Sequence, residues 1–308
     1  MGMGHLFRMI TLFRVLRQNG ADAVIVLLEP HPASIEWLKN ADIPFDVVAE
    51  QISGMTNWEV VITLRHKAIV WINDRLNTDA VHAARIKALG LKLVTFDDLG
   101  SGAALADIQV AALAGVRGEN PVGLNVLVGL EYLILTPEIT CYRRQRSDCG
   151  SWVVNLGGSD THGVTVKVAE WLSEHRQVAT LILGPGFSHD EALNKVIREG
   201  ITVKRSVPSL VAEFSMHDLA ITGGGLTAFE AAAAGLPTVT VANEPWEVAH
   251  CRHLELLGCS LFAGSHEGMD LSVLNVPLDI SRMSRAALAA VGIDGAARVC
   301  RELLILSS

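Results

Sequence analysis

The segment from Asp218 to Pro237, DLAITGGGLTAFEAAAAGLP, constrains the fold of this 308-residue chain more than any other stretch. An apolar run predicts a buried strand, three glycines follow it, and an alanine-rich stretch predicts a helix. Such a strand–glycine–helix unit places unpaired backbone N–H groups at a helix N-terminus, where a phosphate can dock. A Cβ here would obstruct the ligand and forbid positive φ values. We therefore predict an anion-binding turn at Gly223, Gly224 and Gly225.

Two residues of the following helix extend this prediction toward a nucleotide. Thr227 opens the helix, and Glu230 is the only charged residue before Ala234. A carboxylate one turn into the helix can accept hydrogen bonds from a ribose diol. The glycines alone fit an ordinary strand–helix turn equally well, but Glu230 favours a nucleotide site that includes Thr227.

The composition predicts a two-domain α/β protein and excludes several classes of partner. Half of the residues are hydrophobic and only 5% are aromatic, which suits buried parallel strands covered by alanine-rich helices. A net charge of −8 argues against a general affinity for nucleic acid or anionic membranes. The five cysteines contain no C-x-x-C pair, which favours reduced thiols. Without a long apolar run or a signal-peptide pattern, we expect a cytoplasmic protein with no membrane insertion.

Short apolar runs alternate with helical segments, which predicts parallel sheets with right-handed crossovers. The polar stretch YRRQRSDCG, residues 142–150, is interpreted as a linker. It divides residues 1–142 from residues 151–308, each expected to form a Rossmann-like domain. The last segment, Arg298–Leu306, is expected to cap the second domain or to return to the first. The expected strands are Ala23–Leu28, Ala68–Ile72, Leu93–Phe96, Ile108–Ala111, Asn125–Val128, Trp152–Leu156, Val178–Leu183, Ile201–Val203, Leu219–Thr222, Thr238–Val241 and Ser260–Phe262.

The chain starts with a glycine turn, GMGHLFR, that normally follows a first strand. We therefore expect either a truncated chain or a first sheet that lacks its leading strand. Gly4 belongs to the turn, and His5 lies at the positive end of the next helix, where a neutral imidazole is favoured. Such a histidine suits a general base, and Arg8, one turn later, can pair with a phosphate or carboxylate. The alternative is a capping histidine beside a solvated arginine.

Polar residues follow two predicted strands of the first domain. Asp74 ends WIND and Asp98 ends TFDD, at strand ends that face the ligand crevice of α/β folds. Asp98 is expected to orient His5 or to bind a sugar hydroxyl, and Asp74 to contact the substrate. Both could equally cap the turns and helices that follow.

Two loops of the second domain complete the candidate site. NLGGSDTHG provides Gly157, Gly158 and Ser159 after a strand, and VANEPWEVAH provides Asn243 and Glu244 after another. The glycines permit close approach of a ligand, whereas the polar side chains bind sugar hydroxyls or cap a helix. Most other histidines have no ligand-like spacing and are expected at the surface. A P-loop and a dinucleotide-binding G-x-G-x-x-G fingerprint are both absent from the sequence.

In order and spacing these motifs resemble the GT-B superfamily, and more closely the UDP-sugar hydrolases of pseudaminic acid biosynthesis. Those enzymes act on UDP-2,4-diacetamido-2,4,6-trideoxy-β-L-altropyranose, and related proteins are named for spore-coat polysaccharide biosynthesis. The resemblance covers nearly the whole chain and departs from the family pattern at Asn73–Asp74. Its motifs are Gly2–Arg8, Thr95–Leu99, Gly157–Asp160, Gly223–Glu230 and Ile293–Arg298.

The resemblance implies two Rossmann-like domains facing across a cleft, with UDP bound by the C-terminal one. The Gly223–Gly225 loop would hold the pyrophosphate, Glu230 the ribose, and His5 would act on the sugar. Water would displace the nucleotide without a metal or cofactor. A GT-B glycosyltransferase using a UDP-sugar donor and a non-catalytic nucleotide-sugar-binding protein are the alternatives.

Overall fold

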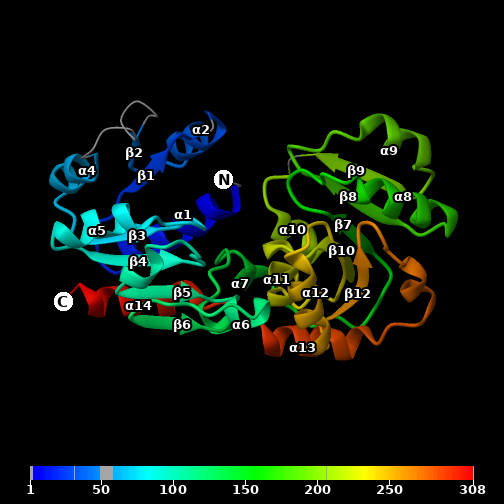
Figure 1. Cartoon of the computed structure of the whole chain (residues 1–308). Coiled ribbons are helices and arrows are strands. Elements are labelled where there is room, and N and C mark those ends of the chain that lie inside the picture. The colour runs from blue at the N-terminus through cyan, green and yellow to red at the C-terminus, as the bar shows by residue number, and fades with distance from the viewer. Residues whose placement is uncertain (1–2, 31, 49–57, 206, 308) are drawn as a thin grey trace. The chain divides into compact units, whose positions relative to one another are not determined.

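The computed structural model describes residues 3–30, 32–48, 58–205 and 207–307 (Figure 1). The chain forms two compact units: unit 1 comprises Met1–Thr136 with Asp294–Ser308, and unit 2 comprises Pro137–Ile293. Each unit contains parallel strands flanked by helices, as the alternating pattern predicts. Every strand expected from the sequence is present. Across the described ranges, no helix combines the length and the apolar character needed to span a bilayer.

The strands of unit 1 form two separate parallel sheets, ordered β1-β2 and β3-β4-β5-β6. The first described residue, Met3, already belongs to α1 (Met3–Gln18), so Gly4 of the expected glycine turn is helical. Within the part of unit 1 that the structure describes, the pair β1-β2 makes no ladder with β3. The strands are β1 (Ile25–Leu28), β2 (Phe45–Val48), β3 (Val70–Asn73), β4 (Lys92–Phe96), β5 (Ile108–Ala111) and β6 (Asn125–Val128).

Helices cover both faces of the four-stranded sheet of unit 1. On one face, α1 and α14 pack together over β4, β5 and β6 through apolar residues such as Leu12 and Leu303. On the other face, α4 and α5 bury Trp58, Ile62 and Ile86. The helices are α1 (Met3–Gln18), α2 (Pro32–Asn40), α4 (Trp58–His66), α5 (Ala80–Ala88), η1 (Ala103–Leu105), α6 (Ala114–Arg117), η2 (Leu130–Tyr132) and α14 (Gly295–Leu306).

Unit 2 contains one six-stranded parallel sheet with the order β9-β8-β7-β10-β11-β12. This is the doubly wound order of a Rossmann fold, in which the winding direction reverses between β7 and β10. Ligands of such sheets bind beyond the carboxyl ends of the strands at this reversal. The strands are β7 (Trp152–Asn155), β8 (Ala179–Leu183), β9 (Ile201–Arg205), β10 (Leu219–Gly223), β11 (Thr238–Ala242) and β12 (Ser260–Ser265).

The helices of unit 2 follow the strands and cover both faces of the sheet. The side chain of Ser209 caps α10 by accepting a hydrogen bond from the Ala212 N–H at 3.1 Å. The helices are α7 (Ile139–Tyr142), α8 (Val164–Glu174), α9 (Asp190–Val196), α10 (Leu210–Ser215), α11 (Leu226–Ala233), α12 (Glu247–Leu256), η3 (Leu271–Asn275) and α13 (Ile280–Ala290).

The boundaries between the two units do not coincide with the expected linker, residues 142–150. The C-terminal helix α14 belongs to unit 1, because Val299, Cys300 and Leu303 are buried against α1 and the sheet. Burying an apolar side chain of this size contributes about 1.5–3 kcal/mol. At the other boundary, α7 and the arginine-rich segment after it belong to unit 2.

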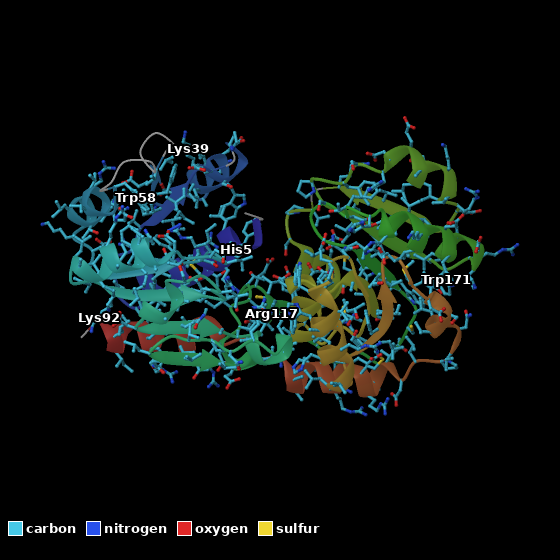
Figure 2. The ribbon with its side chains drawn as sticks, in the orientation of Figure 1. His5, Lys39, Trp58, Lys92, Arg117 and Trp171 are labelled. Atoms are coloured by element: carbon cyan, nitrogen blue, oxygen red, sulfur yellow. The ribbon has the colours of Figure 1, made fainter. Side chains whose placement is uncertain are left out.

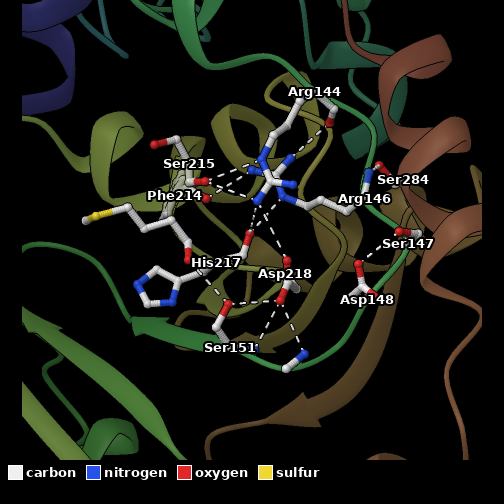
Figure 3. A network of polar contacts seen from close by, with 12 residues as sticks. Arg144, Arg146, Ser147, Asp148, Ser151, Phe214, Ser215, His217, Asp218 and Ser284 are labelled. Atoms are coloured by element: carbon white, nitrogen blue, oxygen red, sulfur yellow. Dashed lines mark hydrogen bonds and ion pairs between the residues drawn. The ribbon is translucent and has the colours of Figure 1, made fainter.

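The arginines of the expected linker donate hydrogen bonds to backbone carbonyls of unit 2, and Arg146 is the buried one (Figure 3). The Arg146 guanidinium is only 1% exposed and donates to the carbonyls of His217, Ala234 and Phe214 at 2.8, 2.7 and 3.0 Å. Arg143 donates to the carbonyl of Val291 at 2.9 Å. The segment therefore binds carbonyls at the ends of α10 and α11 and is packed against unit 2.

Candidate functional site

At the carboxyl edge of the unit 1 sheet, a carboxylate holds the imidazole of His5. Asp74, directly after β3, places Oδ1 2.8 Å from His5 Nδ1. His5 lies in the first turn of α1, at the position labelled in Figure 2. With Nδ1 engaged by a carboxylate, Nε2 is the nitrogen that can accept a proton. Gly4 falls within the same first turn, whereas Gly2 lies outside the described residues.

Arg8 fixes the position of Asp74 and does not offer its charge to a ligand. It is 8% exposed, and its Nε donates to Asp74 Oδ2 at 3.0 Å. Its Nη1 donates to Asp97 Oδ2 at 2.5 Å, and its guanidinium stacks over Phe96 at 5.3 Å. Of the two expected partners of Arg8, a phosphate or a carboxylate, the structure shows carboxylates, those of Asp74 and Asp97, and these occupy both sides of the guanidinium.

These ion pairs shift the protonation equilibria of both partners. Burial lowers the pKa of Arg8, but the charges and hydrogen bonds of Asp74 and Asp97 outweigh it and raise the pKa above the ordinary value. Burial raises the pKa of Asp74, but the bonds from His5 and Arg8 outweigh it and lower the pKa. Asp74 is therefore an ionised carboxylate beside the imidazole.

Asp98 does not contact His5, and the expected pairing of these residues is wrong. Its Oδ1 accepts the backbone N–H groups of Thr78 and Gly100 at 2.9 and 2.8 Å. Asp98 is 1% exposed, so it fastens the loop after β3 to the loop after β4. Asp74, directly after β3, orients the imidazole instead.

In unit 2, three loops converge at the reversal point of the sheet. Gly223 ends β10, and a Cβ placed on it would lie 3.4 Å from Asn243 Nδ2 and 3.7 Å from the Leu156 carbonyl oxygen. Asn243 follows β11 and donates to that carbonyl at 3.0 Å. Its Oδ1 is buried and has no hydrogen-bond partner among the described residues. The sequence thus correctly placed Asn243 beside the glycine loop.

Two side chains of helix α12 contact the backbone of Gly224, one at its N–H and one at its carbonyl. The Gly224 N–H donates to Glu247 Oε2 at 3.1 Å, and the Gly224 carbonyl lies 2.9 Å from His250 Nδ1. A Cβ on Gly224 would lie 2.6 Å from Cys251 Sγ. Close packing on α12 therefore requires glycine here. None of the three glycines at 223–225 has a positive φ, which corrects the conformational reason given for them.

Three residues that the sequence motifs did not indicate also lie against the glycine loop: Glu247, His250 and Cys251. Their spacing of three and four residues places them on one face of α12, which was the available pattern. Burial raises the pKa of the Glu247 carboxyl, although hydrogen bonds from the Asn243 and Gly224 N–H groups oppose the rise.

The first backbone N–H groups of α11 remain available as hydrogen-bond donors. No hydrogen bond from the N–H groups of Gly225, Leu226 or Thr227 is found in the described parts of the chain. Glu230 lies one turn further and is half-buried, and its carboxylate has no ion pair or hydrogen bond among the described residues. Burial raises the pKa of the Glu230 carboxyl to about 7. An unpaired carboxylate near free helix N–H groups can bind a ligand with both anionic and hydroxyl groups.

The loop after β7 forms the other wall of the reversal point. Gly157 has a φ of +91°, and a Cβ on Gly157 or Gly158 would meet nothing within 4 Å. Ser159 is exposed, and its Oγ lies 3.3 Å from Thr161 Oγ1. Asp160 caps α8 by accepting the Val164 and Thr165 N–H groups, each at 2.8 Å. The space above the two glycines is open.

Glu244 lies beside a pair of stacked histidines. Its Oε1 is 3.7 Å from His162 Nε2, and the His162 ring stacks on His266 with centroids 3.6 Å apart. Two other histidines, His82 and His217, are buried, in contrast to the surface positions expected for most of them. His31 lies outside the described residues. Within the described residues, no three His, Cys, Asp or Glu side chains are arranged to hold a metal ion.

No family model matches the chain. It is similar to uncharacterized protein MJ1062 of Methanocaldococcus jannaschii, with 28% identity over 262 residues that cover 78% of this chain. The chain spans about half, 53%, of that relative's length. It is also similar to the spore coat polysaccharide biosynthesis protein SpsG of Bacillus subtilis, with 24% identity over 296 residues that cover 86% of this chain and 81% of SpsG.

Solved structures establish the fold. MurG of Acinetobacter baumannii matches with a TM-score of 0.69 and 16% identity, covering 98% of this chain and 96% of MurG. HepE of Anabaena, in complex with UDP-glucose, matches with a TM-score of 0.67 and 14% identity, covering 99% and 97%. The spinosyn rhamnosyltransferase SpnG, complexed with thymidine diphosphate, matches with a TM-score of 0.65 and 12% identity, covering 98% and 96%. The chain therefore has the GT-B fold of two Rossmann-like parallel-sheet units.

Proposed function

We propose that the protein binds a UDP-sugar through unit 2 and hydrolyses it to UDP and free sugar. The observation that carries the proposal is the pair of glycine loops, after β7 and β10, at the reversal point of the unit 2 sheet. The unengaged N–H groups of Gly225, Leu226 and Thr227 suit the pyrophosphate, and the unpaired Glu230 carboxylate suits the ribose diol.

The chemistry is assigned to the His5–Asp74 pair of unit 1. As a water oxygen bonds to the anomeric carbon, the bond from that carbon to the β-phosphate oxygen breaks and UDP leaves with the electron pair. His5 accepts the water proton at Nε2, and Asp74 stabilises the imidazolium through Nδ1–H. The N–H dipoles at the start of α11 stabilise the departing diphosphate.

The sugar class is part of the proposal. Ser159, Asn243 and Glu244 supply a hydroxyl, an amide and a carboxylate, which suit the hydroxyl and amide groups of an amino or deoxy sugar. The similarity to SpsG supports a role in surface-polysaccharide or nonulosonic acid biosynthesis. The resemblance to the pseudaminic acid pathway hydrolases favours their diacetamido-trideoxy sugar among the substrates to be tested.

A glycosyltransferase is the second candidate, because the same base can deprotonate an acceptor hydroxyl in place of water. The fold match to the rhamnosyltransferase SpnG supports this alternative. Incubation with a panel of UDP-sugars, with and without sugar acceptors, distinguishes the two. Release of free UDP without an acceptor supports hydrolysis, and release only with an acceptor supports transfer. Binding without any release leaves a non-catalytic nucleotide-sugar-binding protein.

A further inference from the structure

Glu247 places a carboxylate inside the loop that is proposed to hold the diphosphate. Its Oε2 accepts the N–H groups of Gly224 at 3.1 Å and Asn243 at 2.8 Å. Its Oε1 lies 3.5 Å from the position that a Cβ would take on Gly225, beside the start of α11. The residue is 7% exposed, so water screens this charge weakly.

The surroundings of Glu247 do not neutralise it. Among the described residues, no lysine or arginine forms an ion pair with it. Burial raises the pKa of the Glu247 carboxyl, and the negative charge of the nearby Glu244 carboxylate adds a smaller rise. The Gly224 N–H, which an external phosphate would otherwise use, is already bound to an internal anion.

A negative charge at this place affects the binding of the substrate, a UDP-sugar, and of the product, free UDP, to different extents. Free UDP carries about one negative charge more than a UDP-sugar, because the terminal phosphate loses its ester bond and ionises again. An adjacent carboxylate repels the more highly charged ligand more strongly.

We propose that Glu247 is a specificity-determining residue whose carboxylate weakens the binding of UDP relative to that of the UDP-sugar and so favours product release. This inference rests on the proposed function of the glycine loop.

The test compares the wild type with Glu247→Gln, which keeps a carbonyl acceptor for the two N–H groups and removes the charge. Calorimetry is done at about pH 8, well above the ordinary range of carboxyl pKa values, and the ligands are uridine, UMP, UDP and UDP-N-acetylglucosamine. We expect the variant to bind UDP about tenfold more tightly, UMP and UDP-N-acetylglucosamine with smaller gains, and uridine unchanged. Glu191→Gln, an exposed carboxylate in the first turn of α9, is the matched control and should change none of the four affinities.

The results that would contradict the proposal can be distinguished from one another. Equal weakening of all four ligands would mean that Glu247 only holds the loop in place, and unchanged affinities would mean that its charge is not felt. A wild type that binds none of the uridine compounds would overturn the proposed nucleotide site, and this inference with it. If the variant unfolds, the wild type alone gives the answer: UDP should bind no more tightly than UDP-N-acetylglucosamine, and tighter binding of UDP contradicts the proposal.

Discussion

Nδ1 of His5 lies 2.8 Å from Oδ1 of Asp74, and this single contact determines which nitrogen of the ring can act as a base. Asp74 is 4% exposed in its side chain, whereas His5 is 26% exposed. The carboxylate is therefore buried behind the imidazole, and the ring keeps an accessible edge. A histidine oriented in this way by a carboxylate is the arrangement that general-base catalysis uses.

Replacing His5 by alanine should abolish turnover while leaving nucleotide binding intact. We expect a loss of roughly 10²-fold or more in kcat, the usual scale of general acid–base catalysis. Steady-state UDP release and UDP calorimetry provide the two measurements. His66→Ala is the matched control, since His66 pairs with Asp46 at 2.9 Å in the same unit. Near-normal turnover of the His5 variant would remove this residue from the mechanism.

Asp74→Asn should lower both activity and stability. Removing the charge leaves buried Arg8 with one fewer carboxylate, which typically costs about 3 kcal/mol or more. Because the pKa of Asp74 is lowered in the folded state, its stabilisation is present above the ordinary carboxyl range and is lost as the pH falls through its folded pKa. Urea titrations at several pH values should thus show the variant and the wild type converging in acid. A gap that stays constant with pH would contradict the ionised role of Asp74.

The two glycine loops should respond differently to alanine. Gly224→Ala forces a Cβ to 2.6 Å from Cys251 Sγ and 2.7 Å from Glu247 Cβ, so we expect a loss of about 1–3 kcal/mol in the free energy of unfolding. Gly158→Ala meets open space, so it should leave stability unchanged. If the loop after β7 contacts the ligand, Gly158→Ala should nevertheless weaken UDP-sugar binding. Unchanged affinity in that variant would place the ligand elsewhere.

Glu230→Gln should stabilise the protein and weaken nucleotide binding at the same time. The pKa of Glu230 is raised from 4.5 to about 7, so the folded state binds an extra proton between these values and the wild type loses stability as the pH rises through them. We expect a gain on the order of 1 kcal/mol at about pH 8, discounted for partial exposure, and none in acid. Thermal unfolding at both pH values and UDP calorimetry measure the two effects. The exposed Glu170→Gln is the control, and unaltered UDP affinity in the Glu230 variant would contradict the ribose assignment.

Arg146→Met should destabilise unit 2 by about 3 kcal/mol or more, because the carbonyls of Phe214, His217 and Ala234 lose buried donors. Arg144→Met is the comparison, since its side chain is 46% exposed. The midpoint of urea unfolding should fall only in the Arg146 variant. Similar midpoints for both would mean that water replaces the guanidinium without cost.

The local pattern of the sequence sufficed for every strand except β2 (Phe45–Val48), which was not expected, and for the glycine turn after β10. Alternating apolar runs and helical segments identify a parallel α/β chain, because strand and helix periodicities are properties of neighbouring residues. The position of Asn243 after a strand also placed it correctly at the carboxyl edge, since parallel strands end at a common edge.

Local sequence patterns could not identify the contact partners of the charged residues. The sequence could not distinguish Asp74 from Asp98 as the partner of His5, because both follow strands and only the register of β3 and β4 against α1 separates them. The sequence pattern also predicted a linker at residues 142–150. In the structure, however, Arg146 is buried by helix ends that lie about 70 to 90 positions away in the chain.

What the sequence determined by itself is therefore the order of strands, glycine turns and helices, since short-range propensity and patterning specify these elements. The tertiary structure alone decided that α14 closes unit 1, that Glu247 occupies the N–H of Gly224, and that Asp74 holds His5. Each of these depends on contacts between distant segments, whose geometry is set by packing and by the pairing of buried charges.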